Sequence, residues 1–158
     1  MKSHSKTWDA DRADGQIRAH LGQEGPLLPI LHALQLAFGH IPEVAIPQVA
    51  LALNLSRAEV HGVVSFYHDF RRVPVGRHEV KLCRAEACQA RGGRAVELAI
   101  EAALGVAMGG TTTDGGVTLT PVYCLGLCAS GPAAMVDGAP IARLTPSGAV
   151  DLAARLTP

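Results

Sequence analysis

Four cysteines are the residues of this chain with the most evident chemistry. They form two pairs, Cys83-x4-Cys88 and Cys124-x3-Cys128, with 35 residues between the pairs. The first nine residues lack the apolar stretch of a secretory signal, and no apolar run approaches the roughly 18 residues of a spanning helix. We therefore expect a cytoplasmic protein without membrane insertion. Thiols stay reduced there, which favours metal ligands or redox groups over structural disulfides.

Each cysteine pair follows the end of a predicted strand. Two loops at the same end of adjacent strands can face each other and offer four thiolates to one site. A [2Fe–2S] cluster needs this ligand set, because each of its two irons is completed by two cysteine sulfurs. The simplest assignment gives Cys83 and Cys88 to one iron, and Cys124 and Cys128 to the other.

Other uses of four cysteines fit the spacing less well. A structural zinc ion also takes four sulfurs, most often from Cys-x2-Cys pairs, so zinc stays open as an alternative. A thioredoxin-type dithiol needs Cys-x2-Cys, which is absent. A Rieske centre would need two histidine ligands, and none of the seven histidines lies next to a cysteine pair.

The C-terminal half is predicted to have the order β-α-β-β-β-α. Strands are expected at 78–82, 117–123, 134–136 and 140–142, and helices at about 89–104 and 145–156. The inward side of the first helix would carry Val96, Ala99, Ile100 and Ala103. Pro121 indicates that the second strand lies at a sheet edge or contains a bulge, and Asp137-Gly138 is typical of a two-residue hairpin turn.

The N-terminal half is predicted to be a helical bundle. An apolar stripe predicts a helix that ends at Gly39, its members being Leu27, Ile30, Leu31, Leu34 and Phe38. A short helix is expected at about 47–53. Ser56 and Glu59 have the spacing of a capping box and begin a third helix, with Val60, Val63, Val64 and Tyr67 on one side. The chain is thus expected to be α+β, with domains at 1–72 and 73–158.

Charge gives little support to a nucleic-acid partner. The chain has 14 basic and 14 acidic residues, although residues 71–94 carry seven arginines and lysines. The spacing from Gln48 to Val60 would also suit a helix-turn-helix regulator that holds a cluster or a zinc ion. Its recognition helix would offer one basic residue, Arg57, close to the acidic Glu59. This is too little positive charge for contacts with DNA phosphates. We expect no binding to nucleic acid.

The four cysteines also occur in a recognisable sequence context. With the segment CLGLCASGP (124–132) and the hairpin MVDG (135–138), they resemble the thioredoxin-like [2Fe–2S] ferredoxin family. That family includes the 24-kDa (NuoE-type) subunit of respiratory complex I and matching subunits of NAD-linked hydrogenases and formate dehydrogenases. Residues 27–70 are similar to its N-terminal region. The loop CRAEACQ (83–89) most resembles the gamma subunit of molybdenum-dependent, NAD-dependent formate dehydrogenase.

The resemblance implies a thioredoxin-like fold and a role in electron transfer. One cluster would exchange single electrons with FMN on an adjacent NAD-binding subunit, beside a large molybdenum and iron–sulfur subunit. FMN, NAD and the molybdenum cofactor would lie on those partners, because this chain has no nucleotide-binding glycine motif and no predicted catalytic residue. Arg84 and the helix after Cys88 would stabilise the cluster's negative charge. A complex I or hydrogenase subunit is the alternative.

Overall fold

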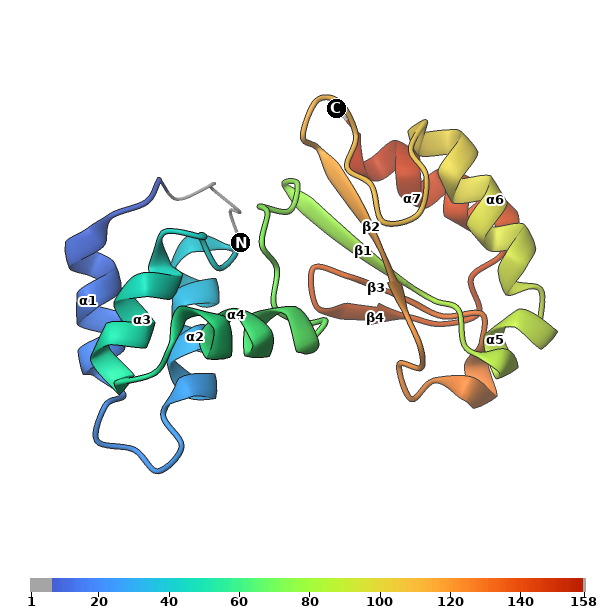
Figure 1. The fold of residues 1–158 in the computed structure, drawn as a ribbon. Coiled ribbons are helices and arrows are strands. Elements are labelled where there is room, and N and C mark those ends of the chain that lie inside the picture. Colours follow the sequence, from blue (N-terminus) through green and yellow to red (C-terminus); the bar gives the residue numbers. More distant parts are fainter. Residues whose placement is uncertain (1–6, 158) are drawn as a thin grey trace. The chain divides into compact units, whose positions relative to one another are not determined.

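The computed structural model describes residues 7–157, which form two compact units divided between Pro74 and Val75. The first is helical, and the second combines helices with a four-stranded sheet, so the expected α+β class is confirmed (Figure 1). That the units are independent domains stays a prediction. None of the helices within the described residues is long and apolar enough to cross a membrane.

The helical unit contains α1 (Ala10–Arg18), α2 (Leu27–Phe38), α3 (Ala45–Leu53) and α4 (Arg57–Phe66). Its core is mainly aliphatic, with Phe38 and Phe70 as buried aromatic residues. Its fully buried members include Ile17, Ile30, Leu31, Leu34, Phe38, Val49, Val60 and Val64. Four of the five residues of the predicted stripe of α2 are therefore core residues, as the helical periodicity requires: Ile30, Leu31, Leu34 and Phe38.

Local signals set the helix ends. Gly39 ends α2 with φ +78°, a conformation that favours glycine. The capping box of α4 is present, since Glu59 N donates to Ser56 Oγ at 3.1 Å and Ser56 N to Glu59 Oε2 at 2.8 Å. The predicted placement of Tyr67 on one side of this helix with Val60 and Val64 is wrong, because α4 ends at Phe66 and Tyr67, just beyond it, is 44% exposed.

The second unit is built on the sheet order β2-β1-β3-β4. Its strands are β1 (His78–Cys83), β2 (Val117–Val122), β3 (Ala134–Val136) and β4 (Ala139–Ile141). β1 is parallel to β2 and antiparallel to β3. β2 lies at the sheet edge, as Pro121 predicts. Asp137 and Gly138 have φ of +51° and +88° and form the expected hairpin turn.

Helices complete this unit: α5 (Glu86–Ala90), α6 (Gly93–Leu104), the single 3₁₀ turn η1 (Cys128–Ser130) and α7 (Pro146–Leu156). α6 and α7 lie side by side against the sheet (Figure 1), where Ile100 and Leu152 join the buried Val80 and Leu119 in one core. Thr145 caps α7 as predicted, accepting from Gly148 N at 3.0 Å.

The predicted single helix at 89–104 is wrong in two respects. It is broken into α5 and α6, because Gly92 adopts φ +93° and begins a new helix. Gly93 also approaches the backbone of α5, where a Cβ would lie 2.8 Å from Cys88 O. The inward face differs as well, since Ala103 is exposed and Glu97 is buried.

Candidate metal centre

The sheet topology brings both cysteine pairs to the side of the sheet where the carboxyl ends of β1 and β2 lie. β1 and β2 are parallel, so their carboxyl ends meet at the same side of the sheet, with Cys83 paired to Val122. Cys83 ends β1, and Cys124 follows two residues after β2. Cys88 lies in α5 and Cys128 begins η1. Each predicted ligand therefore sits at or just after a strand end, or in the short helical turn that follows.

The sulfurs approach one another in pairs. Cys124 Sγ lies 3.6 Å from Cys128 Sγ, and the Cys83 and Cys88 side chains hydrogen-bond to each other. Within residues 7–157, no group of three or more His, Cys, Asp or Glu side chains is arranged so that it could hold a metal ion. The observed pairing of sulfurs suits the donor set of a two-iron cluster, in which each iron takes two thiolates.

The two pairs differ in their exposure to solvent. Cys83 and Cys88 are each 2% exposed and pack with the buried Ala133, whereas Cys124 and Cys128 lie at the surface. A group bound here would have one side inside the protein and the other facing outward.

Backbone N–H groups converge on the cysteines. Burial raises the pKa of the Cys83 thiol, but hydrogen bonds from the backbone of Ala85, from the Cys88 side chain and from the 124–125 loop hold that pKa below its ordinary value. Gly126 N also lies 3.4 Å from Cys124 Sγ. Such donors stabilise anionic sulfur, whether free or bound to iron.

The pKa values of Cys88 and Cys128 shift in the opposite direction. Burial, followed by hydrogen bonding to Cys83, raises the pKa of Cys88. Hydrogen bonding to Cys124 and the negative charge of its thiolate raise the pKa of Cys128. Four thiolates this close repel each other, and metal cations bound between them would relieve that repulsion.

Two residues outside the predicted set join the ligand loops. Arg91 Nε donates to Gly131 O at 3.0 Å, which ties the turn after α5 to the loop after η1. Gly131 lies against Cys88, where a Cβ would be 3.1 Å from the sulfur. The Gly-Pro dipeptide after Cys128 marks a turn in the sequence, but nothing local indicates that it faces a sulfur across the site.

The Arg84 side chain, expected to stabilise the charge of the cluster, is paired with a carboxylate of the protein. Its Nε lies 2.9 Å from Oε2 of the buried Glu97 on α6, in an ion pair that lacks hydrogen-bond geometry. Sequence reasoning missed Glu97, although positions 93, 97, 100 and 104 have the spacing of one helix face.

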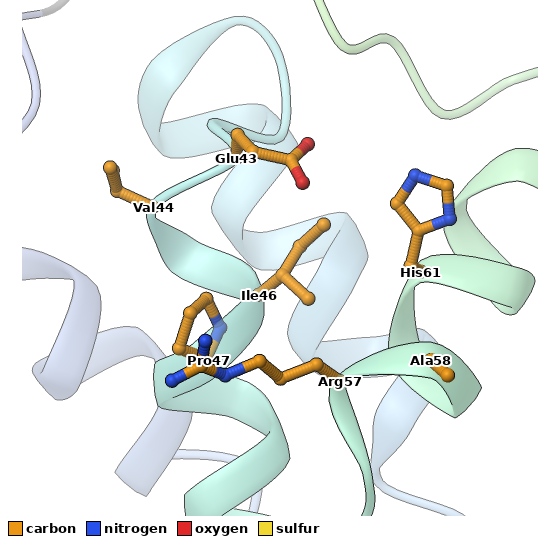
Figure 2. A pocket seen from close by; sticks show the side chains of 7 residues that line it. All are labelled: Glu43, Val44, Ile46, Pro47, Arg57, Ala58 and His61. Carbon is orange, nitrogen blue, oxygen red and sulfur yellow. The ribbon is translucent and has the colours of Figure 1, made fainter.

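A surface pocket of about 480 Å³ belongs to the helical unit, between α3 and α4. Figure 2 shows Glu43, Arg57 and His61 among its lining side chains. The lining contains no cysteine, so the pocket and the cysteine site are separate features of the molecule.

Comparisons with known proteins identify the family of the chain. Residues 13–157 match the model of a family described as thioredoxin-like [2Fe-2S] ferredoxin. A subunit of the NADH-quinone oxidoreductase of Pseudomonas aeruginosa is 38% identical over 122 residues, covering 77% of this chain and 74% of that protein. The NADP-reducing hydrogenase subunit HndA of Solidesulfovibrio fructosivorans is 35% identical over 124 residues, covering 78% and 72%.

A solved structure supports the same relationship. One chain of an NAD+-reducing [NiFe]-hydrogenase in the air-oxidised state superposes with a TM-score of 0.71 at 25% identity. The match covers 82% of this chain and 22% of that much longer one. The protein is thus a member of the thioredoxin-like [2Fe–2S] ferredoxin family.

Proposed function

We propose that this chain holds one [2Fe–2S] cluster on Cys83, Cys88, Cys124 and Cys128 and serves as an electron-transfer subunit of an oxidoreductase complex. The observation that carries the proposal is the meeting of two cysteine pairs at one edge of the sheet, with Sγ atoms 3.6 Å apart in the outer pair. The matched relatives, named as subunits of NADH-quinone oxidoreductase and of NAD(P)-reducing hydrogenases, support it.

The protein's part in this function is to hold and shield the site. When bound, the cluster supplies a one-electron couple. The buried Cys83 and Cys88 exclude water from its inner side, and the backbone N–H groups stabilise charge on the sulfurs. The exposed Cys124 and Cys128 leave the outer side open to a redox partner.

Metal analysis tests this part of the proposal. Full-length protein reconstituted without oxygen should contain about two irons and two labile sulfides per chain and, once reduced, show the EPR signal of one S = 1/2 centre. A colourless protein with one tightly bound zinc would support the structural-zinc alternative instead.

We propose further that the complex is a cytoplasmic NAD-dependent formate dehydrogenase. The support is the resemblance of residues 83–89 to the gamma subunit of such enzymes. FMN and NAD would be bound by one partner subunit and the molybdenum cofactor by another. Affinity purification from the native host should recover both partners and formate-dependent reduction of NAD. Recovery of complex I or hydrogenase subunits would favour the alternative.

A further inference from the structure

The only charged side chain that is buried among the described residues is that of Glu97, which is 2% exposed. It lies in α6, whose buried face is otherwise apolar. Removing a carboxylate from water is costly unless partners replace the lost hydration. Glu97 has two such partners: Arg84 Nε at 2.9 Å from Oε2 and Arg94 Nη1 at 2.7 Å from Oε1.

The two arginines come from different parts of the site. Arg94 is in the first turn of α6 itself, three residues before Glu97, so this ion pair links a helix to itself. Arg84 is in the ligand loop and directly follows Cys83. Its pairing with Glu97 therefore joins the first ligand loop to α6, the helix that packs against α7.

The backbone of Arg84 is also fixed. Arg84 N donates to Val122 O at 2.8 Å, and Cys83 N donates to Ala133 O at 3.0 Å. The loop is thus anchored at its start by the backbone and, through the Arg84 side chain, to α6. Because α5 follows Arg84 and precedes α6, the Arg84–Glu97 contact joins the two ends of the segment that carries Cys88.

We propose that Glu97 is a positioning residue for the metal centre: through Arg84 it holds the Cys83–Cys88 loop in the geometry that binds the cluster. This inference rests on the proposed function. Some residues orient the metal ligands without contacting the metal themselves. Their removal typically lowers metal affinity 10- to 100-fold. Arg94 pairs with the other carboxylate oxygen of Glu97, but it belongs to α6 and does not link that helix to the ligand loop.

A matched pair of variants tests the proposal. Arg84→Gln and Arg94→Gln each remove one positive charge and each leave Glu97 with one arginine, but only the first releases the ligand loop. The readouts, made on reconstituted full-length protein, are the rate of cluster loss to a chelator, the visible circular dichroism of the cluster and its midpoint potential.

Arg84→Gln should lose the cluster roughly 10-fold faster than the unmodified protein, with a changed dichroism spectrum and a lower potential. Arg94→Gln should stay close to the unmodified protein in all three. Urea unfolding of both apo-variants measures the contribution of folding, because Arg94 donates a hydrogen bond to Glu97 and Arg84 does not. A faster loss of the cluster is assigned to the loop where it exceeds the difference in stability between the two apo-variants.

Two outcomes would overturn the proposal: equal behaviour of the two variants, or an Arg84→Gln variant whose cluster matches that of the unmodified protein. Failure of the unmodified protein to assemble a [2Fe–2S] cluster would instead contradict the proposed function. The unmodified sample thus separates the two hypotheses.

Discussion

Gly131 lies against the sulfur of Cys88: a Cβ placed on residue 131 would be 3.1 Å from Cys88 Sγ. The two residues are far apart in sequence, and they meet where the two ligand loops approach each other. The contact is tighter than ordinary van der Waals packing of a Cβ against a sulfur. A side chain at residue 131 therefore requires its neighbours to shift.

Gly131→Ala is expected to weaken the metal centre. Either the Cys88 sulfur or the 131 loop must move by a few tenths of an ångström, and the loop is also held by Arg91. Cluster content after anaerobic reconstitution, measured as iron per chain, should fall. Gly62→Ala is the matched control, since a Cβ at 62 meets nothing within 4 Å. Equal iron content in both variants would contradict this reading of the contact.

The apo-protein should show two classes of thiol. Cys124 and Cys128 are exposed and should be alkylated rapidly by iodoacetamide, whereas Cys83 and Cys88, each 2% exposed, should react only as the protein opens. Peptide mass spectrometry over a time course gives the four rates. In reconstituted protein all four should be protected. Rapid alkylation of any of them in the loaded protein would remove it from the ligand set.

Asp114 should make stability depend on pH. Hydrogen bonds from the Thr112 side chain and Gly116 N, with the nearby Arg77 guanidinium, hold the pKa of this carboxyl below its ordinary value. A lowered folded-state pKa means that the ionised carboxylate contributes stability above the unfolded-state pKa of about 3.9. That contribution is lost as pH falls through the folded-state value.

Urea unfolding of Asp114→Asn at several pH values checks this sign. The variant should be less stable than the unmodified protein at pH 7, and the difference should shrink as the pH is lowered below about 4. The effect should be modest, because the carboxylate is exposed to solvent. A difference that grows on acidification would show that the folded state does not favour the ionised carboxylate.

Packing of α6 should dominate the stability of the sheet unit. Ile100 is fully buried in the core, so Ile100→Ala should lower the free energy of unfolding by about 2–5 kcal/mol. Leu98, on the same helix, is 52% exposed. Leu98→Ala should therefore change the free energy of unfolding by less than about 0.5 kcal/mol. Urea titration of the two apo-variants makes the comparison, and a similar loss in both would contradict the assignment of the buried face of α6.

The helical unit is expected not to bind DNA. α3 and α4 are joined by a short turn, as a helix-turn-helix requires, but α4 offers Arg57 next to Glu59 at its start. Counterion release from phosphates needs several basic side chains on the binding surface. Fluorescence anisotropy with labelled duplexes at about 0.15 M salt should show no binding by the full chain. Sequence-specific retention of DNA would support the regulator alternative.

Features with a strong local cause could be predicted from the sequence. The capping box at Ser56, the glycine end of α2, the Asp137-Gly138 turn and the Thr145 cap all depend on residues within a few positions of each other. The two cysteine pairs likewise indicate ligand loops, although the prediction of one shared site also assumes that the two preceding strands are adjacent. Backbone preference and ligand chemistry depend on the types of neighbouring residues, so they can be predicted before the fold is known.

Other features exist only in the folded chain. The parallel pairing of β1 with β2 places the cysteine loops at one edge, and the break at Gly92 depends partly on the closeness of Gly93 to Cys88 O. The burial of Glu97 against Arg84 and the contact of Gly131 with the Cys88 sulfur join residues from separate elements. Periodicity reports which residues share a face but not what that face meets, so only the tertiary structure decided these contacts.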